Sequence, residues 1–148
     1  MNGEKEGYGK CFWENGDYYI GQFLGNNRTG KGKYFWPNGD CYEGDIVNNK
    51  KEGYGKYIWK DGNYYIGYWS NDKKHGKGKQ FYKDGSLQSE IDFNLDKFEG
   101  FGKYVYENGD YFIGYFHNDL KHGKGKEYYK NGNIKYDGDF ANDKFEGN

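Results

Sequence analysis

The residue types that carry out catalysis or hold metals are present in this chain, but their spacing does not bring them together. The three histidines, His75, His117 and His122, have no metal-ligand spacing to one another. His75 and His122 stand at equivalent places 47 residues apart, which predicts about four strands between them. No Ser/His/Asp or Cys/His arrangement accompanies them. We therefore expect no metal site and no cofactor.

Three carboxylates could pair for acid–base work: Glu43, Glu90 and Asp92. Nothing in the sequence places two of them at the separation at which paired carboxylates act. The Gly-Lys-Gly-Lys strings at 30–33, 76–79 and 123–126 look like phosphate-binding loops, but they lack P-loop spacing and open strands instead of helices. We interpret their glycines as places where rings or backbone come close. The sequence therefore predicts a protein that is not an enzyme.

One lysine recurs at the same position of every repeat. This lysine ladder consists of Lys10, Lys33, Lys56, Lys79, Lys103 and Lys126. Strand spacing places its members about 10 Å apart. In the structural interpretation, the lysine stems cover the glycines opposite them while the ammonium groups stay in water. In the functional one, the row of charges binds an acidic partner or anionic lipid headgroups, although Asp17, Asp40 and Asp110 in the turns would weaken its field.

Aromatic residues recur beside each turn and are the candidate partner-binding residues. They are Trp13, Trp36, Trp59, Tyr82, Tyr106 and Tyr129, with Tyr18, Tyr64 and Tyr111 on the strands that follow. These rings could stand in for the core of a one-layer sheet. Alternatively, because a single sheet cannot cover both of its own faces, they form an exposed surface that binds a helix or extended peptide.

The element that positions these side chains is a β-hairpin repeated along the chain. In the stretch 53–69, Asp61-Gly62 stands between aromatic and β-branched residues, which predicts two strands joined by a type I′ turn. Equivalent units start near Gly7, Gly30, Gly53, Gly76, Gly100 and Gly123, at a period of 23 or 24 residues. Polar loops such as 71–74 connect one unit to the next. The sequence predicts a single array over residues 1–148.

A two-residue turn at Asn15-Gly16 fixes the expected cross-strand partners. It places Trp13 opposite Tyr18, Phe12 opposite Tyr19, and Lys10 opposite Gly21. Trp13 and Tyr18 then share one face, and Phe12 and Tyr19 share the other. The fourth and sixth units carry one extra residue, which a bulge or a three-residue turn must absorb. In the fourth unit Ile91 also replaces a glycine.

Composition agrees with a thin, extended β protein. The chain has 26 glycines, 22% aromatic residues and a mean hydropathy of −1.29, so its apolar content is spread along its length instead of filling a compact interior. A net charge of −1 argues against nucleic-acid binding. No apolar run is long enough to span a membrane. Cys11 and Cys41 fall on the first and fourth predicted strands, about 14 Å apart, which predicts reduced, unpaired thiols.

Certain motifs are typical of a known family. Tyr42-Glu43-Gly44, His75-Gly76-Lys77-Gly78 and His122-Gly123-Lys124-Gly125 resemble the MORN repeat, and the units near Ser86 and Asn133 resemble its variant form with an extra residue. The resemblance covers essentially the whole chain. It implies an all-β, elongated single-layer antiparallel meander of about six tandem β-hairpins, twisted and curved with an open groove. It also implies an interaction module without catalytic residues, of the kind found in cytoskeletal and ciliary scaffolds.

The first functional hypothesis is a cytoplasmic, non-catalytic scaffold, associated with the cytoskeleton or a cilium, that binds a partner helix or peptide along one face. The alternative is phosphoinositide headgroup binding at a membrane surface through the lysine ladder. A third hypothesis is carbohydrate or choline binding by aromatic cages. Open edge strands also predict end-to-end association of copies.

Overall fold

Every secondary-structure element in the described part of the chain is a β-strand. The computed structural model describes residues 6–141 and 144–145. Its strands are β1 (Gly7–Phe12), β2 (Tyr18–Leu24), β3 (Asn27–Phe35), β4 (Cys41–Val47), β5 (Lys50–Ile58), β6 (Tyr64–Ser70), β7 (Lys73–Phe81), β8 (Leu87–Asn94), β9 (Lys97–Val105), β10 (Tyr111–His117), β11 (Leu120–Tyr128), β12 (Ile134–Ala141) and β13 (Lys144–Phe145). The all-β prediction is confirmed. Within the described residues, no helix is long and apolar enough to cross a membrane.

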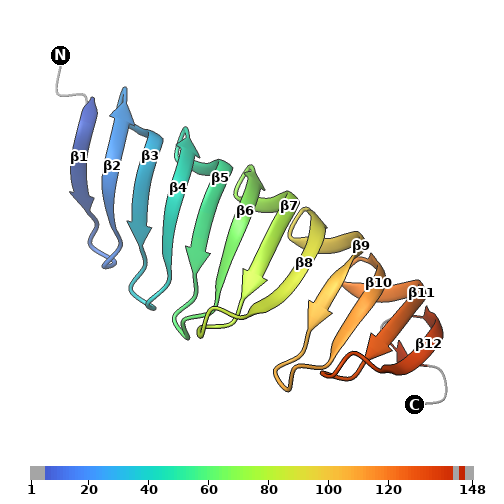
Figure 1. Cartoon of the computed structure of the whole chain (residues 1–148). Helices are drawn as coiled ribbons and strands as arrows, with labels where there is room; N and C mark the ends of the chain where they lie inside the picture. Colours follow the sequence, from blue (N-terminus) through green and yellow to red (C-terminus); the bar gives the residue numbers. More distant parts are fainter. Residues whose placement is uncertain (1–5, 142–143, 146–148) are drawn as a thin grey trace. The chain divides into compact units, whose positions relative to one another are not determined.

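Contacts divide the chain into two compact units, Met1–Lys73 and Lys74–Asn148. In unit 1, strands β1 to β6 each pair antiparallel with the next strand. In unit 2, strands β7 to β13 do the same. Figure 1 shows this sequential order of strands inside each unit. The antiparallel meander of hairpins is therefore confirmed, whereas the single domain over 1–148 stays a prediction.

The turns that carry Asn-Gly and Asp-Gly pairs are three-residue turns, so the predicted type I′ assignment is wrong. The Gly16 amide donates to the Trp13 carbonyl at 3.0 Å, and the Trp13 amide donates to the Asp17 carbonyl at 3.0 Å. Gly16 alone has a positive φ, 99°, which describes a type I turn followed by a glycine bulge. Asn15 Oδ1 accepts from the Asp17 amide at 2.9 Å and fixes the turn. The same pair of hydrogen bonds closes each of the later hairpin turns, the last of which ends at Asn133.

The type I′ turns lie instead between the predicted units, where the sequence suggested polar loops. Asn48 and Asn49 both have positive φ, 47° and 73°, and Asn71 and Asp72 follow with 52° and 71°. Two consecutive left-handed residues define this turn, whose twist matches that of the flanking strands.

The extra turn residue shifts the cross-strand register by one relative to the prediction. Phe12 lies opposite Tyr18, and Lys10 lies opposite Ile20. Glycines pair with glycines, as Gly21 does with Gly32. Since side chains alternate between faces, the shift also changes which residues share a face.

The two faces differ in composition. We call one the tyrosine face; its buried side chains in unit 1 are Tyr19, Phe23, Tyr42, Ile46, Tyr65 and Trp69. The opposite one, which carries the lysine ladder, is the lysine face. Tyr42 is fully buried because its ring lies across the Gly44–Gly55 pair, its hydroxyl donates to the Asp45 carbonyl at 2.7 Å, and Trp69 packs edge-on above it at 5.6 Å. The side chains of one face thus form the core of a single layer.

The fourth and sixth predicted hairpins each contain one extra residue, and a bulge absorbs it. A bulge was one of the two predicted possibilities. The register shifts by one between Gln80 and Phe81 against β8, and between Glu127 and Tyr128 against β12. In β8, Ser89 occupies the place of the buried tyrosine and Ile91 the place of the glycine beyond it. Both are buried, so Ile91 fills the space that a tyrosine ring fills elsewhere.

Candidate partner-binding surface

A continuous row of aromatic rings runs across the hairpin strands on the tyrosine face of unit 1. Its members, which we call the ring row, are Trp13, Tyr34, Trp36, Tyr57 and Trp59. Successive ring centroids lie 5.5, 4.6, 5.4 and 5.3 Å apart. The three tryptophans were predicted to form a stripe, and the structure brings them together. The two tyrosines between them were not recognised as part of it.

The hairpin turns hold the ring row in place. Each tryptophan is the first residue of a turn, and its own backbone amide and carbonyl are both hydrogen-bonded within that turn. The Tyr34 hydroxyl donates to Asp17 at 2.6 Å, and the Tyr57 hydroxyl donates to Asp40 at 2.7 Å. Burial, and after it the hydrogen bond to Asp17, raise the pKa of Tyr34 to about 12. The turn aspartates therefore hold the two tyrosines of the row in place.

Two cations lie against these rings at equivalent repeat positions. The Arg28 guanidinium carbon lies 5.3 Å from the Trp13 ring centre and 5.0 Å from that of Tyr34. The Lys51 ammonium lies between four rings at 5.1 to 5.8 Å: Trp36, Tyr42, Tyr57 and Trp69. Such distances are those of cation–π contacts.

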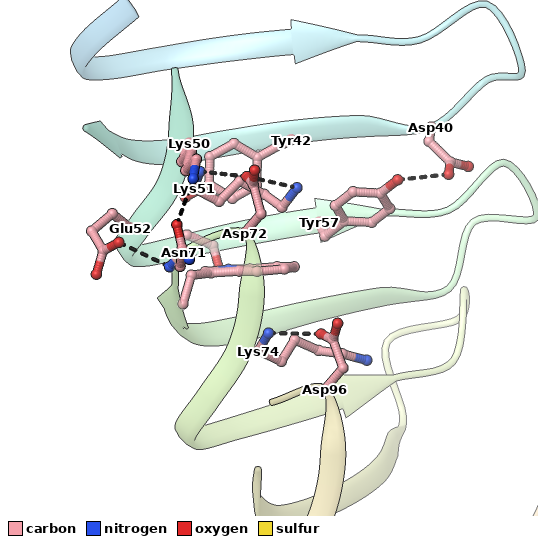
Figure 2. Close-up of polar contacts among 12 residues, drawn as sticks. Asp40, Tyr42, Lys50, Lys51, Glu52, Tyr57, Asn71, Asp72, Lys74 and Asp96 are labelled. Atoms are coloured by element: carbon pink, nitrogen blue, oxygen red, sulfur yellow. Dashed lines mark hydrogen bonds and ion pairs between the residues drawn. The ribbon is translucent and has the colours of Figure 1, made fainter. Parts of the chain in front are cut away.

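Polar groups from the type I′ turns complete this region (Figure 2). Lys51 pairs with Asp72 at 3.5 Å, and the Lys50 ammonium donates to Asn71 Oδ1 at 2.8 Å. The hydroxyl of Tyr57 reaches Asp40 in the same view. A pocket of about 360 Å³ opens between Arg28 and Asp72.

Sequence reasoning missed Arg28 and Lys51, although a signal was available. Both stand two residues before the glycine that starts a predicted hairpin, as do Lys74 and Lys121. Phe98 occupies this position before Gly100. The recurrence of a basic residue at one repeat position could have shown a second row of cations, separate from the lysine ladder.

The corresponding rings of unit 2 have polar partners of their own. The Tyr106 hydroxyl donates to Glu127 at 2.8 Å, and Lys121 pairs with the buried Glu127 at 3.3 Å. The Tyr82 hydroxyl donates to the Val105 carbonyl at 2.6 Å. The Lys135 ammonium lies 5.6 Å from the ring of Tyr129.

The three tyrosines predicted to accompany the tryptophans lie on the lysine face. Tyr18 stacks on Phe35 at 4.3 Å, Tyr64 lies 4.5 Å from the Lys56 ammonium, and Tyr111 stacks on Tyr128 at 4.7 Å. The reason is the one-residue register shift, which separates Trp13 from Tyr18. The predicted face assignment is therefore wrong.

The lysine ladder does not face glycines, contrary to the structural interpretation of the sequence. Glu43 lies opposite both Lys33 and Lys56, and Ile66 lies opposite Lys56 from the other side. Ion pairs join Lys33 to Glu43 at 3.6 Å, Lys79 to Glu90 at 3.8 Å and Lys126 to Asp137 at 4.0 Å. Lys103 lies 4.7 Å from the ring of Tyr111, and Lys10 stands opposite Ile20. These acids on neighbouring strands weaken the field of the ladder.

Two of the three histidines lie close together. His117 and His122 lie on neighbouring strands with ring centroids 6.0 Å apart, and His117 Nδ1 lies 2.9 Å from Glu99. In the part of the chain that the structure describes, no group of three or more His, Cys, Asp or Glu side chains could hold a metal ion. Cys11 and Cys41 lie on β1 and β4 with free thiols, as predicted.

The sequence of the chain matches the model of one known repeat family. The MORN repeat model matches residues 1–18, 19–41, 42–64, 65–87, 92–111, 112–134 and 136–148. The chain belongs to the MORN repeat family. Three of these repeats begin at a buried tyrosine, Tyr19, Tyr42 or Tyr65, so each contains the tight type I′ turn. The predicted resemblance is confirmed, with seven repeats where six hairpins were counted.

Two further comparisons add no closer relationship. No curated protein sequence matches the chain. Among solved structures, the chain is similar to the SAS-4 (dCPAP) TCP domain of Drosophila melanogaster in complex with a proline-rich motif of Ana2 (dSTIL). The identity is 16%, the coverage is 87% of this chain and 82% of that one, and the TM-score is 0.34.

Proposed function

We propose that this MORN-repeat chain is a non-catalytic module that binds a helix or peptide of a protein partner across the tyrosine face of unit 1. The observation that carries the proposal is the ring row. Its five aromatic rings follow one another without interruption, and hydrogen bonds to Asp17 and Asp40 fix the two tyrosines among them. Large, rigid aromatic side chains that order no further on binding are typical anchors of protein interfaces.

The alternatives from the sequence receive less support. The lysine ladder carries ion pairs to Glu43, Glu90 and Asp137 on its own strands, which lowers its attraction for anionic headgroups. The aromatic cage of unit 1 already holds a cation, the Lys51 ammonium, where a choline group would have to enter.

The proposal is tested with a pair of matched double variants of the full chain. Trp36→Ala/Trp59→Ala removes two anchors from the ring row. Tyr54→Ala/Tyr68→Ala removes an exposed ring pair, 5.2 Å apart, from the lysine face. Each protein is immobilised, exposed to native lysate and analysed by quantitative mass spectrometry, with folding checked by circular dichroism.

We expect a set of proteins that the wild type and the lysine-face variant retain and the ring-row variant loses. Retention of the same proteins by a folded ring-row variant would contradict the proposed surface.

A further inference from the structure

The pocket beside the ring row carries an excess of positive charge. Its lining is formed by Arg28, Tyr34, Trp36, Tyr42, Ile46, Asn49, Lys50, Lys51 and Asp72, around a volume of about 360 Å³. Three of these side chains are cationic and one is anionic at pH 7. The chain as a whole has a net charge of −1, so this excess is a local property of the pocket.

The hydrogen bonds within the pocket leave this charge largely uncompensated. Arg28 Nε donates to the neutral amide oxygen of Asn49 at 3.0 Å. Lys50 donates to the neutral amide oxygen of Asn71 at 2.8 Å. Asp72, the one carboxylate of the lining, is 3.5 Å from Lys51 and also accepts from the Lys51 amide at 2.8 Å. An incoming carboxylate would therefore meet cations whose present partners are mostly uncharged.

The shape of the cations suits a carboxylate. The Arg28 guanidinium carbon lies 5.3 and 5.0 Å from the ring centres of Trp13 and Tyr34, so these rings hold the cation beside the pocket. A planar guanidinium held in this way binds a carboxylate with two parallel hydrogen bonds. Rings beside the charges, such as Trp36, supply apolar contact for the residue next to the acid.

We infer that the pocket of unit 1 recognises an acidic peptide segment whose carboxylates engage Arg28 and the Lys50–Lys51 pair. Arg28 and Lys51 stand at the same repeat position on β3 and β5, two strands apart, which corresponds to about 10 Å. In a peptide in the polyproline II conformation, residues three apart lie on the same side of the chain and are about 9 Å apart. The segment therefore carries acidic residues at i and i+3. The inference rests on the proposed function and names the chemistry of the partner.

The same repeat position in unit 2 does not offer this chemistry. Phe98 replaces the cation between Lys74 and Lys121, so no two neighbouring repeats in the described part of unit 2 carry cations at this position. Lys121 also pairs with the buried carboxylate of Glu127. This difference assigns the acidic segment to unit 1.

A membrane surface fits the pocket less well than a peptide does. The Lys51 side chain is 17% exposed and is surrounded by rings, so a headgroup would have to leave the bilayer plane to reach it. Anionic vesicles are therefore a comparison in the test.

The test pans a randomised twelve-residue peptide library against the full chain in low salt. We expect enriched peptides with Asp or Glu at a three-residue spacing beside an aromatic residue. Synthetic versions should bind the Arg28→Gln/Lys50→Gln variant about tenfold or more weakly, because two charge-assisted contacts are lost. Lys50→Gln alone tests the site without disturbing the rings.

The matched control is Lys10→Gln/Lys33→Gln, which removes the same charge from the lysine face of unit 1 and should leave the affinity unchanged. Enriched peptides without acids would overturn the inference while leaving the proposed function standing. No enrichment of any peptide would overturn both. Equal loss of affinity in the control variant would overturn the location. Binding of phosphatidylserine vesicles, but not of acidic peptides, through Arg28 and Lys50 would overturn the assignment to a peptide.

Discussion

The buried tyrosines explain why glycine recurs on both neighbouring strands. The Tyr42 ring lies so close to the β5 backbone that a Cβ at Gly55 would stand 2.1 Å from its hydroxyl oxygen and 2.5 Å from Cζ. The ring itself is locked by its hydrogen bond to the Asp45 carbonyl. Gly32 and Gly125, the second glycines of two Gly-Lys-Gly-Lys strings, lie similarly close to the rings of Tyr19 and Phe112, which agrees with the structural interpretation of those strings.

This packing predicts a large difference between two glycines at the same repeat position. Gly55→Ala should destabilise the chain by about 2–3 kcal/mol, because the Tyr42 ring cannot move without losing its hydrogen bond. Gly9→Ala should be neutral or stabilise by about 0.5 kcal/mol, because its Cβ would lie at an ordinary 3.5 Å from the Phe23 ring and the alanine restricts the unfolded chain. Urea unfolding measures both. Equal effects of the two substitutions would contradict the role given to the tyrosine ring.

Tyr34, a member of the ring row, should make the stability of the folded chain depend on pH in the alkaline range. In the folded chain it ionises at about 12, whereas an unfolded tyrosine ionises near 10. Between these values the folded chain binds more protons than the unfolded one, so stability that is fully present below pH 10 decreases as pH rises towards 12. Urea unfolding at pH 9, 10 and 11 should show a shallower decrease for Tyr34→Phe than for the wild type. An identical decrease in the two proteins would contradict the shift.

At the scale of the elements, the type I′ turns place non-glycine residues in the left-handed region. Asn48, Asn71 and Asn118 occupy the first position of this turn, but Leu95 occupies it between β8 and β9 with a φ of 50°. Leucine in this conformation costs about 1–2 kcal/mol, a strain that asparagine tolerates better. Leu95 is exposed, so little packing offsets the cost.

We therefore expect Leu95→Asn to stabilise the chain by about 1 kcal/mol. The reverse substitution at the equivalent place, Asn48→Leu, should destabilise it by a similar amount. Chemical denaturation of the two variants checks the prediction. Destabilisation by Leu95→Asn would show that a contact of the leucine side chain stabilises the chain by more than its backbone strain costs.

Strand β8 offers a second prediction at this scale. Ser89 and Ile91 replace the usual aromatic and glycine, and Ile91 Cγ1 lies where a Cβ on Gly102 would approach to 2.5 Å. Ser89→Tyr alone should cost about 1–3 kcal/mol through overpacking, and Ile91→Gly alone about 3 kcal/mol through the cavity that it leaves. The double variant recreates the pattern of the other repeats. Its cost should be lower than the sum by about 1 kcal/mol or more, measured in a double-mutant cycle. Additive costs would mean that the two positions do not share one space.

The register error shows which part of this fold the sequence could not specify. The period, the hairpins and the all-β class follow from glycine and aromatic spacing. An Asn-Gly pair, however, serves both a type I′ turn and a three-residue turn that ends in a left-handed glycine. The extra residue of the three-residue turn determines which side chains share a face. For this reason the predicted register grouped Trp13 with Tyr18 instead of Tyr34. The cations of the candidate site were missed for a related reason: only the correct faces bring Arg28 and Lys51 to the rings.

At the scale of the whole molecule, stability comes from neighbouring strands and not from a shared interior. The strands of each unit contact the strands next to them in sequence. In such repeat folds, the free energy of unfolding is close to a sum of local strand terms and nearest-neighbour terms. A local defect should then loosen its own repeats before distant ones.

Hydrogen exchange of the Gly55→Ala variant tests this locality. Amides of β4, β5 and β6 should exchange faster than in the wild type, because the Tyr42 ring that covers the Gly44–Gly55 pair is displaced. Amides of β10 and β11, whose core is formed by Phe112, Phe116 and Phe140, should keep their wild-type rates. The Gly9→Ala chain serves as the control and should match the wild type throughout. An equal acceleration in every strand would show instead that the chain unfolds as one cooperative body, and the nearest-neighbour description would fail.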